Sequence, residues 1–221
     1  MTIRDPTQSP NRAALVIVDL QPDFMPGGAL PVAEGDQLIA PIGDLLRKLG
    51  GILAVATQDW HPPGHVSFAS SHSGRGPGDV MELYGRDQIL WPDHCIQGTA
   101  GAELHPRMDW RAVSAIIRKG TDSASDSYSG FRNNWNAEGD RPSTGLEGYL
   151  REREVETVLV CGLARDFCVK WTAEDAAAAG FRTVFLWDLT RPVDAGSDER
   201  VRQDLLGAGV VMAESTALPS F

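Results

Sequence analysis

The sequence is poor in cysteine and has no long apolar run. Its 221 residues include three cysteines, Cys95, Cys161 and Cys168. So odd and sparse a set argues against a disulfide framework and favours a reducing, cytoplasmic setting. No apolar run approaches the ~20 residues that a membrane-spanning helix needs. The first twelve residues are polar and lack the apolar core of a secretory signal.

Basic residues are also in deficit, with 20 Lys and Arg against 30 Asp and Glu and a net charge of −10. Nonspecific nucleic-acid binding needs a basic footprint, and so does attraction to an anionic membrane surface. We therefore expect neither nucleic acid nor a membrane as partner, whereas a small neutral substrate is unaffected by this argument. The sequence does not determine the oligomeric state, and a homo-oligomer is one of the alternatives.

What the sequence does contain is an alternation of apolar strands and amphipathic helices. Short apolar runs predict strands at 13–19, 52–57, 113–117, 155–161, 182–187 and 210–212, and helical spacing predicts helices at 35–50, 146–153, 166–179 and 197–206. This alternation predicts an α/β fold, a single-domain parallel β-sheet flanked by helices on both faces. Residues 1–12 are expected to form an N-terminal tail, and residues 13–221 the one domain.

Polar groups follow four of the predicted strands. Asp19, Asp59, Lys119 and the turn at 162–168 each come where a strand ends. In open parallel sheets, ligands bind beyond the carboxyl ends of the strands. Two long irregular segments, 58–112 and 119–144, are typical of functional loops. The sequence therefore predicts an active site at this edge.

All five histidines fall between residues 61 and 105, and residues 59–65 read DWHPPGH. Carboxylate and imidazole groups this close together are typical ligands of Zn²⁺ or Fe²⁺. His94 follows in residues 91–95, which read WPDHC. His72 and His105 match no motif, and we interpret them as solvated or capping side chains.

Cys168 is the candidate nucleophile, because it opens a predicted helix after a strand. The positive end of the helix dipole would lower its pKa, and backbone N–H groups there could bind an oxyanion. Asp19 is a candidate proton acceptor, and Lys119 a cation that keeps both groups ionised. The alternatives are a buried apolar cysteine, a capping carboxylate and a surface lysine. Cys161 is interpreted as core and Cys95 as structural.

Taken together, these segments resemble the nicotinamidase/pyrazinamidase family of the isochorismatase-like cysteine hydrolases. The resemblance rests on residues 18–24 (VDLQPDF), 57–62 (TQDWHP), 65–68 (HVSF), 91–99 (WPDHCIQGT), 118–120 (RKG), 128–131 (YSGF) and 162–169 (GLARDFCV). It implies an isochorismatase-like hydrolase fold and the cytoplasmic hydrolysis of nicotinamide to nicotinate and ammonia, a step of NAD salvage, with pyrazinamide as a second substrate.

The resemblance also implies a role for each matching residue. It makes Asp19, Lys119 and Cys168 catalytic. It assigns one divalent ion, zinc first and iron or manganese otherwise, to Asp59, His61 and His94, with His65 as a candidate fourth ligand. Further assignments are an oxyanion hole from the N–H groups of Ala164 and Cys168, a cis Leu163–Ala164 peptide, and a substrate-ring wall made of Phe24, Trp91 and Tyr128.

The chain departs from this family pattern at two places. Arg165 stands where the family usually has threonine, and it would point to solvent, pair with an acid or narrow the pocket. Residues 132–142 look longer than in compact members. The competing readings are a metal-free superfamily amidase acting on a ureido or small acyl amide, a hydrolase whose metal-bound water attacks, and a non-catalytic binding protein.

Overall fold

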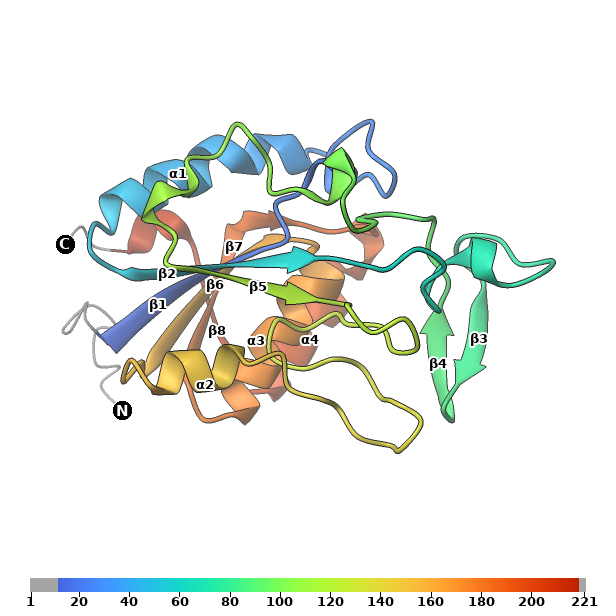
Figure 1. Ribbon diagram of the computed structural model, residues 1–221. Coiled ribbons are helices and arrows are strands. Elements are labelled where there is room, and N and C mark those ends of the chain that lie inside the picture. Colours follow the sequence, from blue (N-terminus) through green and yellow to red (C-terminus); the bar gives the residue numbers. More distant parts are fainter. Residues whose placement is uncertain (1–11, 219–221) are drawn as a thin grey trace.

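A parallel sheet forms the centre of the molecule, in a computed structural model that describes residues 12–218 (Figure 1). The strand order is β5-β2-β1-β6-β7-β8, and every neighbouring pair is parallel. Along the chain these strands are β1 (Ala13–Val18), β2 (Leu53–Asp59), β5 (Ala115–Lys119), β6 (Thr157–Leu163), β7 (Arg182–Arg191) and β8 (Val211–Ala213). The carboxyl ends of the central strands therefore lie at one edge.

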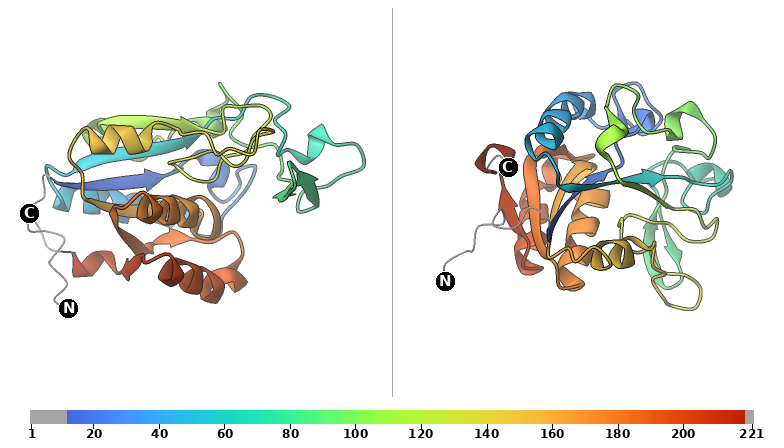
Figure 2. Two further views of the ribbon diagram at one scale, coloured as in Figure 1. Left: turned by 90° about the horizontal axis from the view of Figure 1, so that it is seen from below. Right: turned by 60° about the vertical axis from the view of Figure 1, so that its left-hand side comes forward.

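Helices cover both faces of this sheet, as Figures 1 and 2 show. Helix α1 (Ile39–Lys48) packs on one face, and α2 (Leu146–Arg151), α3 (Lys170–Ala178) and α4 (Asp198–Gly207) pack on the other. The predicted α/β architecture is confirmed. None of the helices between residues 12 and 218 is long and apolar enough to cross a bilayer.

Strand β1 shows why the sheet needs helices on both sides. All six of its residues are buried. Leu15 and Ile17 join the core beneath α1, whereas Val16 and Val18 join the core beneath α3 and α4. Full burial of one such side chain contributes roughly 1.5–3 kcal/mol. A strand with two apolar faces is thus stable only at the centre of the sheet, where the structure places it.

The structure differs from the sequence predictions mainly in an added hairpin, β3 (Val80–Leu83) and β4 (Arg86–Ile89). It projects beyond the carboxyl ends of the strands (Figure 1). Its turn residues Tyr84 and Gly85 both have positive φ, as a type I′ turn requires. The hairpin was missed because half of its strand residues are exposed and only Gln88 is buried, so no clear apolar alternation marks it.

Smaller differences lie at element ends. Strand β5 begins and ends two residues later than predicted, so that Lys119 is its last residue, and β7 runs on to Arg191. The helix predicted from residue 166 begins as a π-helical turn, Arg165–Val169, before α3. The predicted tail lies outside the described residues except for residue 12. The described chain ends near α1, where Lys48 Nζ donates to the Leu218 carbonyl.

Candidate active site

The four predicted strand-end groups meet in one buried cluster. Oxygens of Asp19 and Asp59 and the sulfur of Cys168 all lie within 4.8 Å of one another. The Nζ atom of Lys119 is 2.9 Å from Asp19 Oδ2, 2.5 Å from Asp59 Oδ1 and 3.4 Å from Cys168 Sγ. It also donates to the Ser127 carbonyl at 2.9 Å. One cation thus contacts two carboxylates and the thiol.

Lys119 stays charged although it is only 1% exposed. Burial on its own would lower the pKa of an amine, but the charges of Asp19 and Asp59 outweigh burial and hold the pKa well above its usual value. Asp59 responds in the opposite sense: burial would raise its pKa, and the charges of Lys119 and His61 lower it. Lys119 and Asp59 are therefore an ion pair at neutral pH.

Asp19 is held in the geometry of a proton acceptor. Burial raises its pKa to about 6, against the opposing charge of Lys119. The Thr57 hydroxyl donates to Oδ1 at 2.6 Å. Oδ2 pairs with Lys119 at 2.9 Å but receives no hydrogen bond of good geometry from the described residues. That oxygen is therefore available to take a proton from a neighbouring group.

The prediction that the pKa of the Cys168 thiol is lowered is wrong. Burial raises the pKa of Cys168 well above its usual value, Lys119 lowers it, and Asp19 raises it again. The sulfur is almost fully buried, and the turn that carries it is π-helical rather than the first turn of an α-helix. Desolvation and two nearby carboxylates thus outweigh the helix dipole. At rest the proton is on sulfur, and Asp19 is the adjacent acceptor.

Asp59, His61 and His94 form a buried group with the donor set of a divalent-metal site. The Nδ1 atoms of His61 and His94 are engaged by the carbonyls of Gly120 (3.0 Å) and Pro92 (2.8 Å). Their Nε2 atoms face Asp59 Oδ2 at 3.7 and 4.0 Å. Backbone bonds that fix one imidazole nitrogen and leave the other for an ion are typical of metal ligands. The residues fit a divalent ion.

His65 does not join this group. Its Nδ1 contacts Ser67 Oγ at 2.8 Å, and its Nε2 lies 3.3 Å from the Ser125 carbonyl. A ring nitrogen of His65 instead lies close to potential metal-ligand atoms of His61 and Asp126, and the three atoms lie within 4.8 Å of one another. Both ring nitrogens are thus occupied, which disfavours His65 as a fourth ligand in this conformation.

Two further residues, which sequence reasoning missed, hold the ligand group in place. Gln21 is fully buried and bonds both backbone groups of Asp59, at 2.8 Å each. Gly120 has a φ of +63°, and a Cβ there would lie 2.3 Å from the His61 ring. Only glycine allows this approach. The sequence signal for both was a position shortly after a charged residue at a strand end: Gln21 follows Asp19 by two residues, and Gly120 directly follows Lys119.

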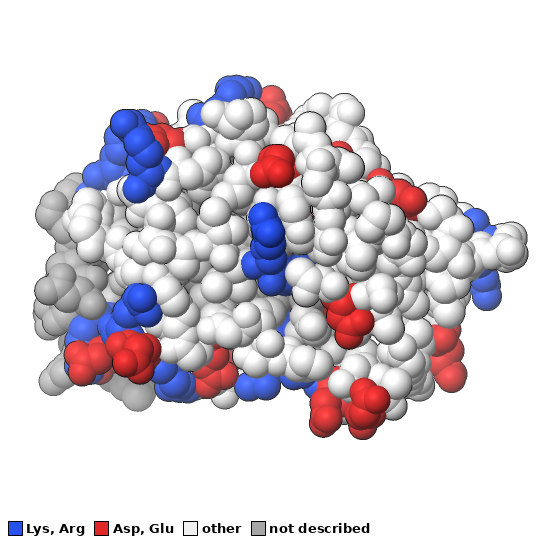
Figure 3. Space-filling view, viewed as in Figure 1, with Lys and Arg blue, Asp and Glu red and all other residues white. Residues whose placement is uncertain are grey.

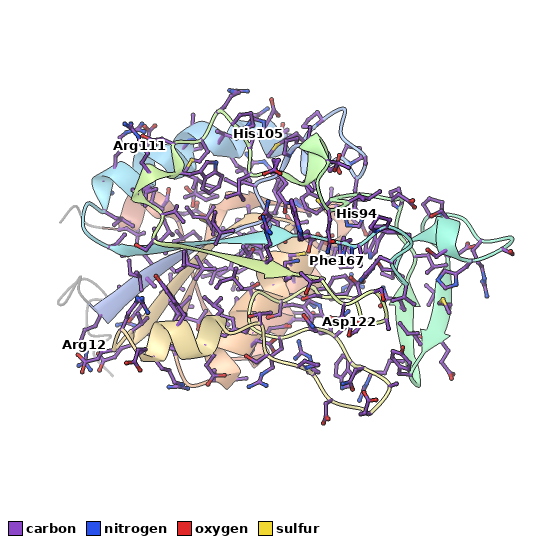
Figure 4. All side chains as sticks on the ribbon, in the orientation of Figure 1. Arg12, His94, His105, Arg111, Asp122 and Phe167 are labelled. Atoms are coloured by element: carbon purple, nitrogen blue, oxygen red, sulfur yellow. The ribbon has the colours of Figure 1, made fainter. Side chains whose placement is uncertain are left out.

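A pocket of about 360 Å³, including its opening to solvent, lies over the cluster. Phe24, Trp91 and Tyr128, the residues expected to wall a substrate ring, line this pocket, and so do Asp59, His61, His94, Ala164 and Cys168. Sequence reasoning missed five further lining residues, Leu30, Asp126, Ser127, Phe167 and Val193. The Phe167 ring packs edge-on against Trp91, with centroids 4.8 Å apart. Figure 4 shows Phe167 and His94 beyond the ends of β2 and β5.

The remaining candidates lie away from the pocket. His72 bonds the Val66 carbonyl, and His105 lies near α1 (Figure 4). Cys161 and Cys95 are fully buried and belong to the core around β1. Arg165 neither points to solvent nor lines the pocket, because it pairs with Asp198 at 2.7 Å. The pairing alternative is therefore the one observed.

Comparison with known proteins agrees with this geometry. The isochorismatase domain family matches residues 13–207. A nicotinamidase of Acinetobacter baylyi is 48% identical over 202 residues, 90% of this chain and 91% of that protein. The solved structure of an Acinetobacter baumannii nicotinamidase/pyrazinamidase superposes with a TM-score of 0.89 at 45% identity, covering 96% of this chain and 100% of that one.

A second similar structure was solved with a bound metal. The pyrazinamidase of Pyrococcus horikoshii in complex with zinc superposes with a TM-score of 0.74 at 36% identity, over 92% of this chain and 99% of that one. Each similarity spans nearly the whole of both proteins, so it applies to the entire domain and not to a shared motif. The chain therefore belongs to the isochorismatase family and, within it, to the nicotinamidases.

Proposed function

We propose that the chain hydrolyses nicotinamide to nicotinate and ammonia, and that it accepts pyrazinamide, which carries the same carboxamide on a nitrogen-containing ring. The observation that carries this proposal is the placement of Cys168, Asp19 and Lys119 beside the Asp59–His61–His94 group in one aromatic-lined pocket. The product would feed NAD salvage in the cytoplasm, the compartment that the cysteine usage favours.

The geometry suits a thioester mechanism. Asp19 takes the proton of Cys168, and the thiolate attacks the carboxamide carbon. The backbone N–H groups of Ala164 and Cys168, two residues that line the pocket, would bind the oxygen that becomes negative. The proton on Asp19 passes to the departing nitrogen, which leaves as ammonia.

The second half of the reaction reuses the same groups. Asp19 deprotonates a water molecule, which attacks the thioester carbon, and the carbon–sulfur bond breaks. Nicotinate leaves, and the proton returns to sulfur. Lys119 remains charged throughout and offsets the negative charge that moves between Asp19 and the thiolate.

Asp59, His61 and His94 would hold the divalent ion, most simply zinc, with iron or manganese as alternatives. When bound, the ion supplies a Lewis-acid anchor for the ring nitrogen of the substrate. Phe24, Trp91 and Tyr128 would enclose the ring. This site therefore selects which amide is cleaved, and the sulfur cleaves it.

The test is ammonia release from nicotinamide, pyrazinamide and a ureido compound by wild-type protein and Cys168→Ala. We expect turnover of the two ring amides by the wild type and none by the variant, with unchanged thermal unfolding. Preference for the ureido compound would favour the metal-free amidase. Near-normal turnover by Cys168→Ala would instead support attack by a metal-bound water and contradict the thioester mechanism.

A further inference from the structure

The turn that carries the nucleophile is anchored from outside the pocket by the side chain of Arg165. We call residues 164–168 the nucleophile turn. The Arg165 guanidinium donates from Nε to the Thr190 hydroxyl and from Nη2 to the Thr190 carbonyl, each at 2.9 Å. Nη1 contacts both carboxylate oxygens of Asp198, at 2.7 and 2.8 Å. The guanidinium also stacks on Trp187, 4.2 Å from the ring centroid.

The next side chain, Asp166, anchors the same turn to the connection between β7 and α4, residues 192–197. Its two oxygens accept from the backbone N–H groups of Val193 and Asp194, each at 2.9 Å, and from the Ser197 hydroxyl at 3.2 Å. Val193 lines the substrate pocket. Arg165 and Asp166 therefore bind the strand, the helix and the loop that follow the nucleophile turn.

Neither side chain lines the pocket, but both lie between two groups that do. Ala164 directly precedes Arg165, and Cys168 follows Asp166 by two residues. Because the peptide unit between Ala164 and Arg165 is rigid, a shift of Arg165 moves the Cα of Ala164, the atom bonded to the Ala164 nitrogen. The five N–H donors of a guanidinium have a fixed planar geometry, so they restrict the position of the arginine more tightly than the ammonium group of a flexible lysine would. The Arg165 side chain is 8% exposed, so water can do little to replace these hydrogen bonds.

We propose that Arg165 is a positioning residue that holds the Ala164 N–H where the reaction develops its oxyanion. The proposal rests on the proposed nicotinamide hydrolysis. It concerns transition-state binding, because Phe24, Trp91, Tyr128 and the metal ligands come from other elements, and Phe167 is the one aromatic residue that the nucleophile turn adds to the pocket lining. Loss of Arg165 should thus slow the chemical step and leave binding of the ground-state ring intact.

The experiment compares wild type with Arg165→Met and Arg165→Lys in three measurements: nicotinamide kinetics, inhibition by nicotinaldehyde and inhibition by nicotinate. The Cys168 thiol adds across the aldehyde C=O, so that a carbon–sulfur bond forms, the carbonyl π bond breaks and the thiol proton moves to oxygen. That oxygen would occupy the oxyanion position. Nicotinate binding involves no such addition and reports the ground-state pocket.

We expect kcat to fall ~10–100-fold in Arg165→Met, somewhat less than the full loss of an oxyanion donor. The inhibition constant for nicotinaldehyde should weaken by a similar factor, and KM and nicotinate inhibition should stay within about twofold. For Arg165→Lys, kcat and nicotinaldehyde inhibition should lie between those of the wild type and those of Arg165→Met, because lysine keeps only the charge that faces Asp198. If Arg165→Met does not fold, Arg165→Lys carries the same comparison.

Arg202→Met is the matched control. Arg202 stacks on the same Trp187 ring at 3.6 Å but has no hydrogen bond to the nucleophile turn among the described residues. It should retain wild-type kinetics. Unchanged kcat and unchanged inhibition by nicotinaldehyde in both Arg165 variants would overturn the proposal. It would also be overturned if inhibition by nicotinate weakened by the same factor as inhibition by nicotinaldehyde. Wild-type protein that releases no ammonia would count against the proposed function, whereas the aldehyde-to-nicotinate ratio would still test the positioning.

Discussion

At the scale of single residues, the site is defined by charges that burial keeps close together. Lys119 and Asp19 are both essentially fully buried, so each depends on its partners for stabilisation and not on water. This makes the pKa of Asp19 a functional quantity: burial raises it to about 6. A carboxyl group with that pKa can gain and lose a proton close to neutrality.

The first prediction is a pH profile. Only ionised Asp19 can accept the thiol proton, so kcat/KM should rise with pH through about 6 and fall on the acid side. Asp19→Asn should abolish turnover at every pH, because an amide cannot accept that proton. The check is kcat/KM for nicotinamide from pH 4.5 to 8, at pH values where the fold stays intact. A profile that is flat below pH 6 would exclude Asp19 as the base.

The second prediction concerns Lys119→Met. Removing one partner of a buried ion cluster leaves uncompensated charge and typically costs about 3–5 kcal/mol. We expect a loss of that size in the free energy of unfolding, measured in urea, together with loss of turnover. Lys48→Met is the control, since among the described residues Lys48 donates to the Leu218 carbonyl, far from the pocket. Wild-type stability in Lys119→Met would contradict the charge network described here.

At the scale of elements, the β3–β4 hairpin supports the wall of the pocket. Gln88 on β4 donates to Asp126 Oδ2 at 2.8 Å and lies 3.4 Å from the Tyr128 hydroxyl. Trp91 Nε1 donates to the same hydroxyl at 3.2 Å. The aromatic wall is thus held by an element that the core does not include.

The third prediction follows from these contacts. Gln88→Leu removes both donors and leaves the Asp126 carboxylate short of a partner, so the wall should lose its fixed position. We expect KM for nicotinamide to rise several-fold with a smaller change in kcat. Glu82→Ala, an exposed position on β3, is the matched control and should leave both constants unchanged. An unchanged KM in Gln88→Leu would mean that the hairpin does not position the substrate.

An element could be predicted from the sequence where its burial leaves a clear apolar pattern. The strands at 13–19, 52–57 and 155–161 could be predicted because both faces are apolar. The ends of the first two strands marked Asp19 and Asp59, and the end of the third marked the turn at 162–168. The hairpin carries no such pattern. Leu30 and Val193 reach the pocket through tertiary contacts that local sequence does not encode. The thiol pKa was predicted with the wrong sign because burial, which raises it most, and the nearby carboxylates of Asp19 and Asp59 both arise from tertiary packing.

At the scale of the whole molecule, the site gathers residues from most of the chain, from Asp19 to Val193. The face shown in Figure 3 carries scattered acidic and basic side chains with no continuous basic surface. A neutral ring amide meets no strong field on this face. The specific recognition therefore lies inside the pocket.

The fourth prediction is that metal binding and stability are coupled. An ion that binds only the folded chain stabilises it by roughly 2.7 kcal/mol at 100 times its dissociation constant. Chelation of untagged protein should lower both Tm and turnover, and added zinc, iron or manganese should restore both. Elemental analysis before and after identifies the ion. Full activity and an unchanged Tm in metal-free protein would show that Asp59, His61 and His94 hold no functional ion.

The placement of the described chain ends bears on how the enzyme can be used. Ala13 begins β1, and Leu218 is bonded to Lys48 at the end of α1, whereas the pocket lies beyond the opposite, carboxyl ends of the strands. Figure 1 shows the described chain ends on the side of the molecule opposite the carboxyl ends of β2 and β5. A carrier domain or a solid support joined through either end would therefore leave the pocket mouth facing open solution, which makes this fold suited to immobilised or fused catalysts.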